Sequence, residues 1–140
     1  MQMSARDKFH HLVRTALENE GWTITHDPYH IDLGFFDFYI DLGAERLIAA
    51  TREGEIIAVE IKTFLASSTI SEFHTAIGQF INYRIALETD DPKRRLYLAV
   101  PLDIYKGFFK NPFIQTVISR NQVPILVYNI EKQEVAQWIN

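Results

Sequence analysis

The chain has 140 residues, 47% of them hydrophobic and 23% charged, which is typical of one globular domain and unlike a disordered chain. With 14 basic and 18 acidic residues its net charge is −4, which excludes the strongly basic surface of a protein that grips nucleic acid unaided. It contains no cysteine, which excludes disulfides and thiolate metal sites, and no apolar run reaches transmembrane length. We therefore expect a soluble, cytoplasmic protein.

The first third of the chain begins with a predicted helix. Apolar residues recur there at three- and four-residue spacing, between Ser4 as a helix cap and Gly21 as a stop. A strand over 22–25 follows and is closed by a turn at 26–28. The register of 29–42 stays open, because three aspartates interrupt its apolar pattern.

The middle of the chain predicts a β-hairpin followed by a helix. Two strand-like runs at 47–51 and 56–62 are separated by the turn residues 52–55. An amphipathic pattern predicts a helix over 71–88, and 95–100 predicts a strand.

The last third predicts two short helices and a closing hairpin. The helices lie within 103–120 and are broken near Asn111-Pro112, because proline disrupts a helix interior. The strands 124–129 and 134–138 form the hairpin, and its apolar edge invites pairing with another chain. The order of elements predicts one α/β domain over residues 1–140, with a mixed, mostly antiparallel sheet flanked by helices.

Two charges interrupt the apolar strand that ends the first hairpin. Side chains alternate along a strand, so Glu60 and Lys62 share one face with Ala58, and the other face is apolar. Buried charges are costly unless they are paired, bind a metal or face a cleft. The simpler interpretation is a structural ion pair on an edge strand, and the alternative is a functional site.

A metal site is the functional interpretation. Mg²⁺ and similar ions take oxygen ligands from one or two carboxylates and often bridge to a phosphate. The hairpin can fold Asp41 back beside Glu60, and Glu45 is a rival for the same place. Lys62 would then orient or deprotonate a water, or stabilise the charge of the transition state.

The second predicted helix offers two polar side chains to the same site. Gln79 and Tyr83 are four residues apart and therefore share one helical face, where either can hydrogen-bond a metal-site water or a phosphate. The alternative is a helix flank with a tyrosine that reaches towards solvent.

Two further clusters have a functional and a structural interpretation. Lys93-Arg94-Arg95, with Arg84 and Lys106, is a basic concentration that either contacts a nucleic-acid backbone or lies in solvent at a strand entry. Phenylalanines near Asn111-Pro112 either form an apolar patch or fill the core; they are Phe108, Phe109 and Phe113.

The order of acid, hairpin, Glu-x-Lys and Gln-x-x-x-Tyr resembles the PD-(D/E)XK nuclease superfamily and its RecB-like members. The resemblance implies a restriction-endonuclease-like core and a site made of Asp41, Glu60, Lys62, Gln79 and Tyr83. Asp41 and Glu60 would hold Mg²⁺ or Mn²⁺. Since Ile40 stands where the superfamily has proline, Asp37, Asp41 and Glu45 remain alternatives for the first acid. The first helix of the superfamily often adds a residue near the metal, and Asp7, His10 and Glu18 are the candidates here.

Nearly the whole chain also resembles the XisH family of fdxN element excision controlling factors in cyanobacteria. The resemblance runs from about Ser4 to Asn140 through stretches that include 22–28, 39–45, 58–62, 72–74, 76–84, 97–101 and 137–140. It implies a role in programmed DNA excision during heterocyst development, alongside a XisI-like companion factor and a separate recombinase, and a homodimer or higher oligomer. Two hypotheses follow: a metal-dependent DNA endonuclease, or an accessory module with a nuclease fold that works through DNA or protein contacts.

Overall fold

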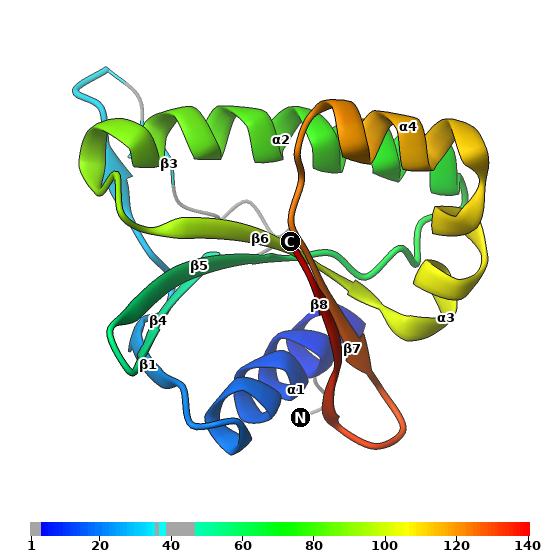
Figure 1. Cartoon of the computed structure of the whole chain (residues 1–140), viewed down its shortest axis with the longest axis horizontal. Coiled ribbons are helices and arrows are strands. Elements are labelled where there is room, and N and C mark those ends of the chain that lie inside the picture. Colours follow the sequence, from blue (N-terminus) through cyan, green and yellow to red (C-terminus); the bar gives the residue numbers. More distant parts are fainter. Residues whose placement is uncertain (1–3, 36, 39–46) are drawn as a thin grey trace.

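The structure, a computed structural model, describes residues 4–35, 37–38 and 47–140 (Figure 1). The helical elements are α1 (Ala5–Asn19), α2 (Thr69–Asp90), α3 (Leu102–Lys106), the 3₁₀ turn η1 (Phe108–Lys110) and α4 (Pro112–Arg120). The strands are β1 (Thr23–His26), β2 (Ile31–Asp32), β3 (Asp37–Phe38), β4 (Leu47–Arg52), β5 (Glu55–Ile61), β6 (Arg95–Pro101), β7 (Ile125–Asn129) and β8 (Glu134–Ile139). None of these helices is long and apolar enough to span a membrane.

One six-stranded sheet, ordered β1-β4-β5-β6-β7-β8, organises the molecule. Its two inner pairs, β5–β6 and β6–β7, are parallel, whereas β1–β4, β4–β5 and β7–β8 are antiparallel. Each parallel pair is joined through helical structure, because a parallel connection must return the chain to the starting edge. The predicted mixed α/β architecture, mostly antiparallel and flanked by helices, is confirmed.

Helices cover both faces of the sheet (Figure 1). α1 lies on one face and contacts β8, whereas α2 and α4 lie on the other. The buried apolar residues accordingly form two clusters. The α1 cluster includes Val13, Leu17, Ile57, Val59 and Ile61. The α2 cluster includes Ala58, Phe73, Phe80, Leu98 and Val127.

The helix caps explain where three helices begin. The Ser4 hydroxyl accepts a hydrogen bond from the Asp7 amide at 3.1 Å, as predicted. The Ser68 hydroxyl accepts from the Ser71 amide at 3.3 Å and starts α2 two residues earlier than its apolar pattern indicates. Asn111 caps α4, with proline at the first helical position.

The stretch 29–42, whose register the sequence left open, contains β2 and β3, which pair with each other in a separate two-stranded sheet.

The three phenylalanines near Asn111 differ in their burial. Phe109 is fully buried in the α2 cluster and Phe108 packs against it, so the core interpretation holds for these two. Phe113 is 63% exposed, so the core interpretation is wrong for it.

Candidate functional site

Glu60 and Lys62 lie at the carboxyl end of β5, on the face of the sheet that α2 covers. Ala58, which shares their face, belongs to the α2 cluster, whereas Ile57, Val59 and Ile61 belong to the α1 cluster, as the strand alternation predicts. β5 lies between β4 and β6. The interpretation of an ion pair on an edge strand is therefore wrong in its placement, because the pair sits on an inner strand.

Both charges are almost completely removed from solvent. The side chain of Glu60 is 0% exposed and that of Lys62 is 1% exposed, and the Lys62 Nζ lies 3.8 Å from Glu60 Oε1. Lys62 also donates a hydrogen bond to Gln79 Oε1 on α2. The structure thus brings together three of the five predicted site residues from β5 and α2.

The backbone of Lys62 is fixed at both of its polar groups. Its amide donates to the Ala99 carbonyl at 3.0 Å, and its carbonyl accepts from the Tyr128 hydroxyl at 2.8 Å. Burial, with the negative charges of Asp103 and Glu72, raises the pKa of Tyr128 well above its usual 10.0, so this hydroxyl remains a neutral donor. Hydrogen bonds to β6 and β7 therefore fix the backbone from which the Lys62 side chain extends.

Glu72, in the first turn of α2, secures the segment that follows Lys62. Its two carboxylate oxygens accept from the amides of Phe64, at 3.1 Å, and Ala66, at 3.4 Å. Phe64 has a φ of +55° and is buried, so this segment is held in a conformation that favours glycine. Neither Glu72 nor Tyr128 was predicted to belong to the site. For Glu72 the sequence offers one indication, since it is an acidic residue in the first turn of the helix that follows Lys62.

α2 places Gln79 and Tyr83 in two different environments, and neither is the solvent-facing helix flank that was the alternative prediction. Gln79 is half-buried and bonded to Lys62, whereas Tyr83 is only 8% exposed and is part of the α2 cluster. The alternative of a tyrosine reaching to solvent is therefore wrong. Roles of Gln79 and Tyr83 towards a phosphate or a metal-site water stay predictions.

Asp37 is the one of the three candidates for the first acid of the predicted metal site that lies within the described residues. Asp41 and Glu45 lie outside the described residues. Asp37 lies on β3, is half-exposed, and accepts a hydrogen bond from His30 Nε2 at 2.9 Å. Within the ranges 4–35, 37–38 and 47–140, no three acidic or histidine side chains form a group that could hold a metal ion.

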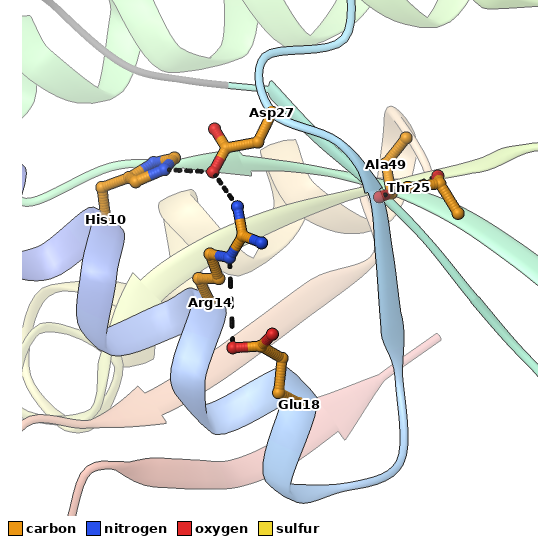
Figure 2. A network of polar contacts seen from close by, with 6 residues as sticks. All are labelled: His10, Arg14, Glu18, Thr25, Asp27 and Ala49. Carbon is orange, nitrogen blue, oxygen red and sulfur yellow. Dashed lines mark hydrogen bonds and ion pairs between the residues drawn. The ribbon is translucent and has the colours of Figure 1, made fainter.

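The polar residues of α1 form a separate network with Asp27 (Figure 2). Asp27 Oδ2 accepts from His10 Nε2 at 2.9 Å and from Arg14 at 2.8 Å, and Arg14 also lies 4.0 Å from the half-exposed Glu18. Burial raises the pKa of Asp27, but the hydrogen bonds and positive charges of His10 and Arg14 outweigh it and leave that pKa below the usual 3.8. The network ties α1 to the end of β1.

This network accounts for two of the three candidates that the first helix offers. His10 is engaged by Asp27, which is the satisfied interface histidine that is the commoner outcome for such a residue. Glu18 pairs with Arg14 on the helix that covers the face opposite Glu60. Asp7 lies beside the cap of α1, and its role near a metal stays a prediction.

The arrangement at the end of β5 has a defined chemical capacity. The Glu60 carboxylate is a suitable ligand for a divalent ion. The Lys62 ammonium beside it can stabilise a negatively charged oxygen. Burial strengthens both interactions, since little water competes with them. Among the described residues, Glu60 and Lys62 are the only acidic or basic ones that are buried.

Comparison with known proteins found relatives that match nearly the whole chain. A family model described as XisH protein matches residues 3–136. An XisH family protein from Nostoc punctiforme PCC 73102 is 54% identical, with a TM-score of 0.89, over 96% of this chain and 100% of that one. An fdxN element excision controlling factor protein from Anabaena variabilis is 53% identical, with the same TM-score and coverage. A comparison with curated proteins found no match.

Proposed function

Because the chain belongs to the XisH family, we propose that it controls the programmed excision of a DNA element, acting on DNA as a nuclease-like protein with a divalent metal. The fdxN element named for the Anabaena variabilis relative supports the excision role. The mixed sheet, with a Glu-x-Lys strand at its centre and a Gln-x-x-x-Tyr helix over it, supports a restriction-endonuclease-like PD-(D/E)XK core.

The residues divide the chemistry of phosphodiester cleavage between them. Asp41 and Glu60 would hold Mg²⁺ or Mn²⁺, and the bound ion would supply Lewis-acid stabilisation of the phosphate and a more acidic water. Lys62 orients that water or stabilises the negative charge of the transition state. Gln79 fixes the ammonium of Lys62, and Tyr83 places the phosphate.

The observation that carries this proposal is the burial of Glu60 and Lys62. An ion pair buried on an inner strand contributes little net stability, because taking both charges out of water offsets their attraction. Apolar side chains of the same size would fill that position at least as stably. The site therefore fits a chemical role better than a structural one.

The second candidate function is a catalytically idle accessory module that acts through protein partners. The net charge of −4 favours it, because little non-specific affinity for phosphates is available without a partner. A XisI-like companion factor, a recombinase and a second copy of this chain are the partners that we propose.

The experiment is cleavage of labelled plasmid and branched DNA with Mg²⁺ or Mn²⁺, with and without the companion factor. Wild type is compared with Glu60→Gln and Lys62→Met. Two matched controls carry the same changes at exposed positions of the β7–β8 turn, Glu131→Gln and Lys132→Met. Circular dichroism checks that each variant is folded.

The nuclease proposal expects wild type and both controls to cut, and both site variants to be inactive while folded. Cutting that persists in Glu60→Gln would show that the nuclease site lies elsewhere. Absence of cutting in every condition, together with no metal binding by calorimetry, would leave the accessory module.

A further inference from the structure

The parallel ladder between β5 and β6 changes where it reaches Lys62. Along a strand that lies between two others, successive residues direct their N–H and C=O groups alternately to one neighbour and to the other. On β6 the Ala99 carbonyl faces β5 and accepts from the Lys62 amide at 3.0 Å. The Leu98 amide faces the other way and donates to the carbonyl of Pro124, directly before β7, at 2.9 Å. Position 101 therefore faces β5 as Ala99 does, and its N–H group would be the ladder donor for the Lys62 carbonyl.

A proline occupies this position. Pro101 has no N–H group, so the ladder bond to the Lys62 carbonyl cannot form. The hydroxyl of Tyr128 takes the place of that donor, at 2.8 Å from the same carbonyl oxygen. Tyr128 lies opposite Pro101 on β7, so its side chain spans the end of β6 to reach the strand beyond. A side-chain hydroxyl thus replaces a backbone amide at the residue that carries the proposed chemistry.

Tyr128 is anchored on the face of the sheet that α1 covers. It is fully buried and belongs to the α1 cluster, whereas the Lys62 side chain reaches Gln79 on α2. Its ring meets the Phe9 ring of α1 edge to face, with 6.1 Å between the ring centres. Close packing of this kind holds a side chain in one rotamer. The α1 layer therefore fixes the hydroxyl that holds the Lys62 carbonyl.

Lys62 depends on such support because it is the first residue after β5, which ends at Ile61. Its amide is bonded to Ala99 and its carbonyl to Tyr128, so the peptide units on both sides of its Cα are held. These two peptide units set the φ and ψ angles of the residue and hence the direction in which its side chain leaves the backbone.

We propose that Tyr128 is a positioning residue for Lys62, because its hydroxyl supplies the ladder donor that Pro101 lacks and thereby sets the direction of the ammonium. That ammonium lies 3.8 Å from Glu60 Oε1 and donates to Gln79. Because Tyr128 is fully buried, it acts through the backbone of Lys62 and not on a substrate. The effect on cleavage rests on the nuclease function proposed above, whereas the positioning of the ammonium does not.

Two substitutions remove and restore the donor. Tyr128→Phe deletes the hydroxyl and keeps the ring. Pro101→Ala returns a backbone N–H group, and alanine adopts the conformation of Pro101 without strain, since φ is −66° and ψ is 148°. The double variant therefore carries a ladder amide in place of the hydroxyl. Tyr97→Phe is the matched control, because Tyr97 is also buried in the α1 cluster and its hydroxyl donates to Asn140 instead.

NMR of the full chain with isotope-labelled lysine reports on Lys62 without DNA. The carbonyl-carbon signal of Lys62 reports its hydrogen bond, and the ammonium-nitrogen signal reports the surroundings of the side-chain end. We expect both signals to move in Tyr128→Phe, to return towards their wild-type positions in the double variant, and to stay unchanged in Tyr97→Phe. A tyrosine that only fills the core would leave the ammonium signal unmoved, because phenylalanine keeps the ring.

Cleavage of labelled plasmid with Mg²⁺ tests the catalytic consequence. We expect Tyr128→Phe to lower kcat about ten-fold with KM unchanged, because a misplaced catalytic group slows the chemical step and leaves the contacts with DNA intact. The double variant is expected to recover kcat, and Tyr97→Phe to retain it. A tyrosine that only stabilises the fold would lower the stability of Tyr128→Phe without this change in kcat.

The proposal is overturned if the ammonium signal of Lys62 in Tyr128→Phe coincides with that of wild type, or if this variant keeps the kcat of a wild type that cuts. It is also overturned if Pro101→Ala fails to restore the signals, because the hydroxyl would then not replace a ladder amide. Loss of the fold in Tyr128→Phe supports the proposal where Pro101→Ala reverses it and overturns it where it does not. If wild type cuts no DNA, the nuclease function fails, and the two NMR signals still decide whether Tyr128 positions Lys62.

Discussion

Replacing Lys62 by methionine tests whether the buried pair is a structural or a chemical feature. The substitution keeps most of the side-chain volume and removes the ammonium that lies 3.8 Å from Glu60 Oε1. At an effective dielectric constant of about 20, two unit charges at that distance attract by about 4 kcal/mol. Gln79 Oε1 also loses its donor. We therefore expect Lys62→Met to lower the free energy of unfolding by about 3–5 kcal/mol.

The double variant Glu60→Leu, Lys62→Met is the informative comparison. It removes both charges, so neither has to be taken out of water, and replacement of a buried ion pair by apolar residues is often neutral or stabilising by about 1–4 kcal/mol. We expect the double variant to be at least as stable as wild type, with a strongly non-additive cycle. A pair kept for structure would instead make the double variant as unstable as the single one.

The assay is equilibrium unfolding in urea, followed by tryptophan fluorescence, in buffer with a metal chelator. Trp22 is buried and Trp138 is partly buried in the α1 cluster, so both report its loss. The control Lys132→Met, at an exposed turn position, is expected to change stability by less than about 0.5 kcal/mol. A loss below about 1 kcal/mol in Lys62→Met would refute the reasoning from burial.

Three further predictions concern the surroundings of the site. Because the folded pKa of Asp27 is below 3.8, the stabilisation by its carboxylate is present above pH 3.8 and is lost as the pH falls through the folded pKa. Asp27→Asn should therefore lower the free energy of unfolding, measured in urea, by about 1–3 kcal/mol at neutral pH and by progressively less in acid. Burial and a hydrogen bond to Asp90 raise the pKa of Tyr29 to about 12, so its neutral form stabilises the fold below pH 10.0, and stability should fall between pH 10 and 12 by less in Tyr29→Phe than in wild type. Glu72→Gln should weaken the bonds to Phe64 and Ala66 and speed hydrogen exchange of those two amides, as measured by NMR.

Each of these predictions has an outcome that contradicts it. A pH-independent effect of Asp27→Asn would show that the charge of this carboxylate does not matter to folding. Equal alkaline losses in wild type and Tyr29→Phe would show that another group titrates. Unchanged exchange in Glu72→Gln would show that the segment after Lys62 is held by packing alone, and Glu88→Gln, elsewhere on α2, is the matched control.

Local signals in the sequence were sufficient for the elements that carry their own pattern. The apolar spacing and the Ser4 cap predicted α1, and the turn at 52–55 predicted the β4–β5 hairpin with Glu60 and Lys62 on one face. These features depend on residues that are close together in the chain. They therefore do not require knowledge of which strands become neighbours.

Features set by distant parts of the chain could not be predicted in the same way. The inner position of β5 depends on its parallel pairing with β6, which lies beyond the whole of α2. The burial of Arg94 depends on the carbonyl of Ile57, on the neighbouring strand. The stretch 29–42 carried acids at positions where a strand of the main sheet would need apolar residues, and its described part forms a small separate sheet.

α2 connects the site at the end of β5 to a distant part of the fold. It crosses from the end of β5 to the start of β6, and Gln79 accepts a hydrogen bond from Lys62, whereas Arg84, five residues later, donates to the Gln122 carbonyl after α4. Residues five apart on a helix point in directions about 140° apart, because each residue turns it by about 100°. One helix therefore orients the Lys62 ammonium on one side and anchors the segment after α4 on another.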